Sequence, residues 1–264
     1  YGSSDPAWSV LESSKSTAKT AKRLGASPLA DYRDDREGLR LSSDGGTVGF
    51  AYQVFGKVPA RFSLGDRQLE LIKEGDTPAG LRAPRLDGLK VTDWKDNTAP
   101  KLAGQTLALD RYEVSRSLAI ASDASSFLLG TELWLRSLTA QAKERWKLRV
   151  PGNAWAVNLA DNDRLAVAAY GDGTIRWHRY DTGKELLAFF PHADRKRWVL
   201  WTPQGYYDCS PGAEELIGWH VNRGKAEAAD FFPAAKFREQ FYRPDVIQFV
   251  LAKGDVAEAL KEAA

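Results

Sequence analysis

The sequence predicts an all-β fold built from antiparallel strands. Its clearest stretch consists of two short hydrophobic runs, residues 164–170 and 174–180, joined by Gly171-Asp172-Gly173. An Asp-Gly pair supplies the positive φ angles that a tight hairpin turn needs. A third run, residues 186–190, follows directly. We therefore expect neighbouring strands to pair in chain order as an antiparallel meander.

A repeat extends this pattern over the second half of the chain. Trp134, Trp177 and Trp219 are separated by 43 and 42 positions. A polar turn and a hydrophobic run precede each of them, the turns being residues 122–125, 161–163 and 202–205. A repeat of about 40 residues that holds four short strands is the period of a β-propeller blade. The sequence therefore predicts a β-propeller, as a complete or a partial ring.

These residues resemble the WD-repeat β-propellers. Residues 172–176 followed by 182–186 resemble the second hairpin of such a blade, and 202–205 its Ser-Pro-Asp-Gly turn. His192-Ala193-Asp194 is similar to the His-x-Asp that opens the next blade. The Trp-Asp dipeptide of the family is absent near His178-Arg179.

A narrower resemblance covers residues 198–251. Residues 201–212, 216–224 and 241–246 resemble the end of the propeller in bacterial WD-repeat proteins, in which the propeller is often joined to a caspase-like peptidase domain. The resemblance implies a module of a larger signalling or proteolytic protein. It implies no catalytic residue, because these residues contain no peptidase motif.

Composition narrows the classes of function. The chain has 264 residues, 43% of them hydrophobic, a net charge of +2 and one cysteine, Cys209. A surface of mixed sign argues against nucleic-acid and anionic-membrane binders, and a single cysteine excludes an internal disulfide. We expect a cytoplasmic protein without a cofactor. Because methionine is absent, we expect a fragment or a processed chain, whose repeat count is a minimum.

Three regions are expected in chain order. Residues 1–37 have the Ser-rich, charged composition of an N-terminal arm or linker. Residues 38–225 hold the blades: a first one over 39–71, an irregular blade or long loop over 73–104, a four-strand set over 117–150, and the blade around Gly171. A last blade has strands at 198–201, 205–208 and 216–221, and we expect another part of the chain to supply its fourth strand. Residues 226–264 change to helical spacing, with a helix cap at Gly254-Asp255.

Candidate chemistry is sparse. Cys209 and His220 form the only pairing of a nucleophile with a base that the composition permits, because the chain has one cysteine and only three histidines. The other two histidines are His178 and His192. His178 occupies the repeat position of His220, which favours a packing role for both. Scattered histidines predict no metal site. A Cys-His hydrolase, or a propeller with a small-molecule site in its central channel, is the alternative function.

A basic triplet is the candidate interaction surface. Arg195, Lys196 and Arg197 are flanked by Arg179, expected on the neighbouring blade, and by Trp198. Basic residues beside aromatic ones suit a contact with a protein or a polyanion; the alternative is a loop that is merely solvated. We expect a non-catalytic scaffold of a larger bacterial signalling or caspase-like peptidase protein. Its partner would be another protein or another domain of the parent chain, with no nucleic acid or membrane.

Overall fold

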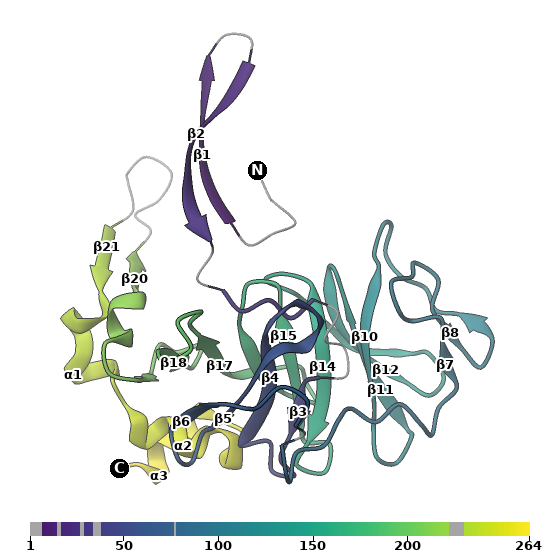
Figure 1. The fold of residues 1–264 in the computed structure, drawn as a ribbon. Helices are drawn as coiled ribbons and strands as arrows, with labels where there is room; N and C mark the ends of the chain where they lie inside the picture. Colours follow the sequence, from purple (N-terminus) through teal and green to yellow (C-terminus); the bar gives the residue numbers. More distant parts are fainter. Residues whose placement is uncertain (1–6, 15–16, 27–28, 34–37, 77, 222–229) are drawn as a thin grey trace.

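The computed structural model describes residues 7–14, 17–26, 29–33, 38–76, 78–221 and 230–264, with residues 7–26, 220 and 221 described by their backbone alone. Antiparallel sheets are the main secondary structure of the described chain, and short helices gather near its C-terminus (Figure 1). Within these ranges, no helix combines the length and the apolar character that crossing a membrane requires.

The central sheet contains the stretch that the sequence singled out. Its order follows the chain: β14 (Ala154–Ala160), β15 (Leu165–Tyr170), β16 (Ile175–Arg179), β17 (Glu185–Pro191), β18 (Trp198–Trp201) and β19 (Tyr207–Cys209). Gly173 has φ +82° in the turn between β15 and β16, a conformation that glycine adopts without steric cost. The predicted hairpin at Gly171–Gly173 is confirmed.

Other sheets cover both faces of the central one. Successive side chains of a strand point to opposite faces, so β15 contributes to two cores. Leu165, Val167 and Ala169 belong to the core shared with the first sheet, and Ala166, Ala168 and Tyr170 to the core shared with β10–β13. Burial on both faces explains why this strand is a continuous apolar run.

Three further sheets accompany the central one. The first consists of β3 (Arg40–Leu41), β4 (Thr47–Gln53), η1 (Val54–Gly56), β5 (Lys57–Ser63) and β6 (Gln68–Leu71). The second consists of β7 (Val91–Thr92), β8 (Lys101–Leu102) and β9 (Gln105–Thr106). The third consists of β10 (Ser115–Ile120), β11 (Ser126–Thr131), β12 (Trp134–Thr139) and β13 (Glu144–Arg149). Each is an antiparallel meander in chain order, as expected for propeller blades.

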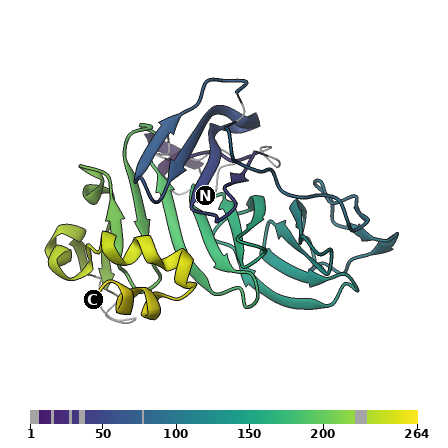
Figure 2. The same ribbon diagram turned by 90° about the horizontal axis from the view of Figure 1, so that it is seen from below.

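The sheets form an arc (Figure 2), and β14 contacts both β3 and β10, so the first strands of three sheets lie together. Asn158 of β14 donates hydrogen bonds to the carbonyls of Leu39 and Arg82 at 2.9 and 3.0 Å. Ser117 of β10 donates to the carbonyl of Ala154 at 2.8 Å. These contacts join the first strands of neighbouring sheets, which is the arrangement around a propeller axis. The predicted all-β propeller fold is confirmed.

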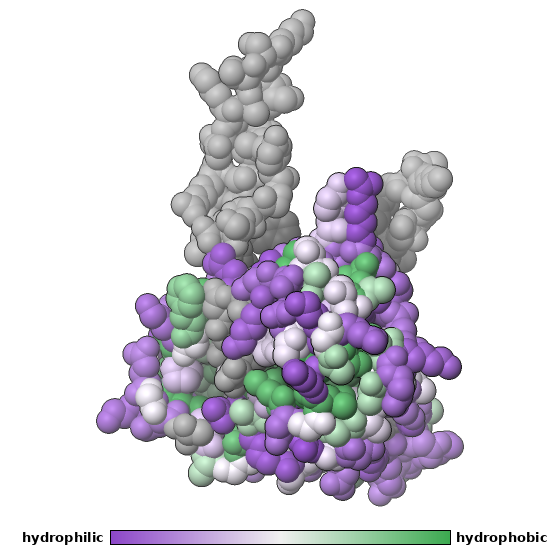
Figure 3. All heavy atoms as spheres, turned by 90° about the vertical axis from the view of Figure 1, so that its right-hand side faces the viewer, coloured by the Kyte–Doolittle hydropathy of each residue, from purple (hydrophilic) through white to green (hydrophobic). Residues whose placement is uncertain are grey.

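The arc does not follow the chain order. The first sheet packs on the central sheet, while β7–β9 packs on the far side of β10–β13. The face of the molecule at the β7–β9 end is mainly hydrophilic, with a smaller hydrophobic area near its middle (Figure 3).

The C-terminal segment adds a small sheet and helices. It contains η2 (Ala213–Leu216), β20 (Gly218–Val221), β21 (Asp230–Pro233), η3 (Ala234–Phe237), α1 (Arg238–Phe241), α2 (Pro244–Lys253) and α3 (Val256–Glu262). Asp255 caps α3 by accepting from the N–H groups of Ala257 and Glu258. The cap predicted at Gly254-Asp255 is confirmed.

Two parts of the chain differ from expectation. The arm expected over residues 1–37 contains an antiparallel hairpin, β1 (Ala7–Ser14) and β2 (Thr17–Ala26), which extends away from the sheets (Figure 1). The prediction of a separate last blade was wrong, because the strands expected in it pair differently. β18 pairs with β17 through a short turn and β20 pairs with β21, so β18 and β19 extend the central sheet.

Candidate interaction surface

The basic triplet lies in the turn between β17 and β18. The Asp194 carboxylate accepts the N–H groups of Lys196 and Arg197, each at 2.9 Å, and the Arg197 Nε at 2.6 Å. Burial acts to raise the pKa of Asp194, but these hydrogen bonds outweigh it and hold the pKa well below its usual range. Asp194 therefore organises the turn and neutralises Arg197, while Arg195 and Lys196 stay exposed.

Trp198 does not belong to this surface. Its side chain is 4% exposed and its ring packs on Phe62 of the first sheet, with ring centroids 4.8 Å apart. Because Trp198 opens β18 with its side chain on the face covered by the first sheet, it is a core residue.

Arg179 does not belong to this surface either. It ends β16, beside the first residues of β17, whereas the triplet follows the last residues of β17. The seven residues of that strand span about 20 Å, and both ends lie in one sheet, not in neighbouring blades. Arg179 pairs with Asp181 and donates to the carbonyl of Gly254 at 3.4 Å. It thus holds the turn between α2 and α3.

Cys209 is a buried thiol. It is 7% exposed, and burial, followed by the charges of Glu214 and Asp208, raises its pKa to about 11. A thiol of such high pKa is a poor nucleophile at neutral pH. The side chain of His220 lies outside the described residues, so the geometry of the Cys209–His220 pair stays untested.

His178 has the packing role expected for it. Its Nδ1 lies 3.3 Å from the carbonyl of Gly183 and its Nε2 lies 3.1 Å from the hydroxyl of Tyr170. A carbonyl only accepts, so Nδ1 carries the proton and Nε2 accepts from Tyr170. Complete burial lowers the pKa of His178 to about 4.

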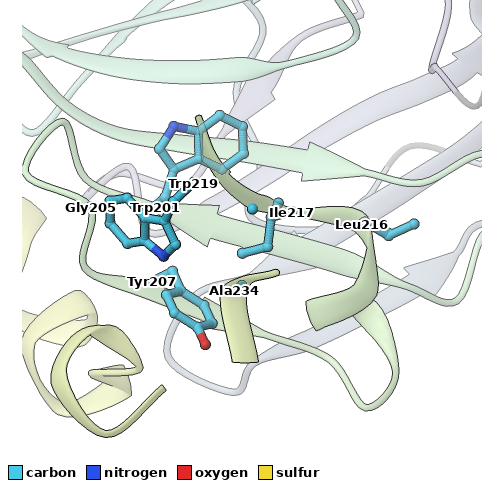
Figure 4. A pocket seen from close by; sticks show the side chains of 8 residues that line it. Trp201, Gly205, Tyr207, Leu216, Ile217, Trp219 and Ala234 are labelled. Carbon is cyan, nitrogen blue, oxygen red and sulfur yellow. The ribbon is translucent and has the colours of Figure 1, made fainter. Parts of the chain in front are cut away.

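An apolar cavity lies between β19 and β20, and we call it the aromatic pocket (Figure 4). Its volume is about 370 Å³. The lining residues are Trp201, Gly205, Tyr207, Leu216, Ile217, Gly218, Trp219 and Ala234. The rings of Trp201, Tyr207 and Trp219 gather around it, and Trp219 packs on Phe241 of α1 at a centroid distance of 4.4 Å.

A charged groove of about 750 Å³ lies beside the same strand. It runs between the β5–β6 turn, the segment after β19, and α1. Arg67 forms two hydrogen bonds to the buried carboxylate of Asp208, at 2.8 and 2.6 Å. Arg238 pairs with Glu214 at 2.8 Å and lies over the ring of Tyr242 at 4.0 Å.

Tyr207 connects the aromatic pocket with the charged groove. Its ring lines the pocket and its hydroxyl donates to Glu214, which lines the groove. Burial, followed by the hydrogen bond to Glu214 and the negative charge of Glu214, raises the pKa of Tyr207. The two cavities therefore share a wall made by β19 and η2.

The pocket was not predicted from the sequence. Its walls come from β18, the segment around η2, and η3, and only their folding brings these segments together. The sequence pattern places Trp201 and Trp219 in strands and assigns them no site. The one signal for the pocket in the sequence was Trp201, an aromatic residue that ends a strand just before a polar turn. Among the described residues, no three His, Cys, Asp or Glu side chains converge as metal ligands would.

The comparisons with known proteins are limited. No protein-family model and no curated protein matches the sequence. Among solved structures, BamB from Moraxella catarrhalis is similar at a TM-score of 0.29 and 12% identity, over 63% of this chain and 42% of BamB. A chain of the mitotic checkpoint complex is similar at a TM-score of 0.35 and 12% identity, over 62% of this chain and 60% of that one. This chain thus spans less than two thirds of either, and the propeller assignment rests on the sheets.

Proposed function

We propose that this chain is a non-catalytic protein-interaction scaffold. The observation that carries the proposal is the aromatic pocket beside the charged groove, at the outer end of the central sheet. Trp, Tyr and Arg are the residue types enriched at the centres of protein interfaces. Here Trp201 and Trp219 line the aromatic pocket, and Arg238 lines the charged groove beside it.

The strongly shifted titratable groups support structural roles. His178 and Tyr170 are buried and hydrogen-bonded to each other, and Asp208 is paired with Arg67. The Cys209 pKa is raised, the opposite of what thiolate chemistry requires. None of these groups combines an open position with a pKa near neutrality.

We propose separately that this chain is part of a larger protein. The resemblance of residues 198–251 to propellers joined to caspase-like peptidases supports a place in a larger bacterial signalling or peptidase protein. Reading the gene on both sides of these residues tests it. A continuous reading frame into a peptidase or a signalling domain is expected, and a gene that encodes neither would overturn it.

The interaction role is tested by panning random peptides displayed on phage against the folded chain. Enriched peptides are expected to converge on a common motif and, once synthesised, to bind with one-to-one stoichiometry in calorimetry. A second panning against an unrelated propeller is the control. If both proteins enrich the same peptides, or neither enriches any, the scaffold role is contradicted.

The exposed turn at Arg195–Arg197 stays a proposed second contact. Arg195 and Lys196 are exposed, and Arg197 lies at the edge of the charged groove, beside Gly212. Arg195→Glu with Lys196→Glu should weaken a partner that spans the groove and places an acidic side chain at the turn. Unchanged binding of the panned peptides would remove the turn from the surface.

A further inference from the structure

The aromatic pocket has the size and the lining expected of a binding pocket for one side chain. A cavity of about 370 Å³ lies at the lower end of the range for ligand pockets. Apolar and aromatic side chains make up most of its walls, and Gly205 and Gly218 also line it. Such a pocket can bind a large apolar side chain, because burial of apolar surface is favourable and non-directional.

Neighbouring contacts hold the walls in place. Trp219 is wedged between Phe237 and Phe241, with centroid distances of 6.1 and 4.4 Å. On the other side, a Cβ on Gly205 would lie 2.3 Å from the ring of Trp219, so only glycine permits this approach. Because the rings are already packed, an entering side chain does not have to order them first.

Two carboxylates in the charged groove beside the pocket have no ion-pair partner among the described residues. In the charged groove, Asp208 and Glu214 neutralise Arg67 and Arg238. Asp66 and Glu215 also line this groove, and neither has an ion pair among the described residues. Glu215 is exposed and is followed in the chain by Leu216, a wall of the aromatic pocket.

We infer that the aromatic pocket and the charged groove bind a peptide segment of a protein partner that places a large apolar side chain next to a lysine or arginine. The apolar side chain enters the pocket between Trp201 and Trp219, and the cationic side chain lies toward Glu215. This inference rests on the proposed scaffold role and specifies the chemistry of the partner.

The two contacts differ in strength. Aromatic anchors in desolvated pockets contribute most to peptide affinity, commonly more than about tenfold each. An exposed ion pair contributes up to about fivefold, and reversal of one charge adds repulsion. Removal of the pocket wall should therefore abolish binding, while charge reversal should weaken it by about tenfold at low salt and less at high salt.

The experiment uses three short fluorescent peptides and anisotropy titrations with the whole chain. The first peptide has a phenylalanine between lysines, the second has glutamates in place of the lysines, and the third has alanine in place of the phenylalanine. The first should bind at least about tenfold more tightly than the other two. Equal binding of all three, or none, overturns the inference.

Matched variants locate the site. Glu215→Lys should weaken the lysine peptide about tenfold, and Glu74→Lys, an exposed charge far along the chain on the β6–β7 connection, should not. Trp219→Ala should abolish binding, with circular dichroism to check its folding. If Trp219→Ala fails to fold, Glu215→Lys decides, because its side chain is exposed. Binding that neither variant weakens overturns the inference.

Other occupants give distinguishable results. A benzophenone in place of the phenylalanine should crosslink to residues 201–219, and crosslinks elsewhere contradict the site. If the chain self-associates and Trp219→Ala makes it monomeric, the pocket binds a second copy and the peptide inference fails. If panned peptides bind away from residues 201–219, the scaffold role survives and this inference does not.

Discussion

The only cysteine of the sequence, Cys209, has a free and buried thiol. The sequence allowed it to pair with His220, and the structure surrounds it with core residues and carboxylates. Its environment disfavours the charged form that thiolate chemistry uses.

We predict that Cys209 resists alkylation in the folded protein. The rise of its pKa from 9.0 to about 11 lowers the thiolate fraction near pH 8 about a hundredfold, and burial restricts access further. Mass spectrometry after iodoacetamide treatment should show no label until guanidinium is added. Rapid labelling of the native chain would restore the hydrolase alternative.

We predict that His178 makes stability fall as the pH falls. Its pKa is 6.5 in the unfolded chain and about 4 when folded, so below pH 6.5 the unfolded chain binds a proton that the folded chain excludes. Between pH 7 and pH 5 the free energy of unfolding should drop by about 2 kcal/mol from this group. Urea denaturation at both pH values measures it.

His178→Gln is the matched variant, because its amide also donates and accepts but does not titrate. The wild type should lose about 2 kcal/mol more than this variant over the same pH interval. An identical loss in both proteins would show that His178 is protonated in the folded state.

At the scale of elements, the packing of the first sheet on the central sheet is concentrated in a few rings. Phe62 of β5 stacks on Phe189 of β17 with centroids 4.2 Å apart and planes 23° apart. Trp177 of β16 adds a hydrogen bond from its indole N–H to the carbonyl of Gly45 at 2.9 Å. The repeated tryptophan thus joins two sheets.

We predict that Phe62 and Phe189 are energetically coupled. A double-mutant cycle with Phe62→Leu and Phe189→Leu should give a coupling energy of about 0.5–1.5 kcal/mol, the usual range for aromatic pairs. Phe127, which is buried in the separate core between β7–β9 and β10–β13, is the control partner and should be additive with Phe62. Additivity of Phe62 with Phe189 would contradict the stacking.

At the scale of the whole molecule, stability should decline from the centre of the arc to its end. The central sheet is covered on both faces, whereas β7, β8 and β9 have two residues each and cover one side of β10–β13. Backbone amides exchange faster where local unfolding costs little free energy, which is the case where few residues are buried around them.

We predict that hydrogen exchange, followed by mass spectrometry, is slowest in β15 and β16 and fastest, among the sheets with described side chains, in β7–β9. The β14 and β17 strands should lie between these extremes. If exchange is uniform across the sheets, the chain unfolds as one cooperative unit and the graded arrangement is contradicted.

Much of the fold follows from local patterns. The Asp-Gly turn at Gly171–Gly173, the all-apolar run of β15 and the cap at Asp255 each depend on neighbours in the chain. Strand pairing within a meander follows from short turns. Local physics therefore predicted the antiparallel meanders and the C-terminal helices, but not the sheet that β18 and β19 join.

The site depends on contacts between distant residues. Whether Trp198 is exposed depends on the first sheet, which covers it through Phe62. The role of Arg179 depends on the turn after α2 reaching it, more than seventy residues later in the chain. No local pattern predicts either contact, so neither the burial of Trp198 nor the contact of Arg179 with the turn after α2 could be predicted.

The sequence by itself determined an all-β propeller with a repeated tryptophan, because strand periodicity and turn chemistry are short-range properties. Tertiary structure alone decided that β18 and β19 extend the central sheet and that Trp201, Tyr207 and Trp219 enclose a pocket. The physical reason is that burial and edge pairing are settled by packing among segments far apart in the chain.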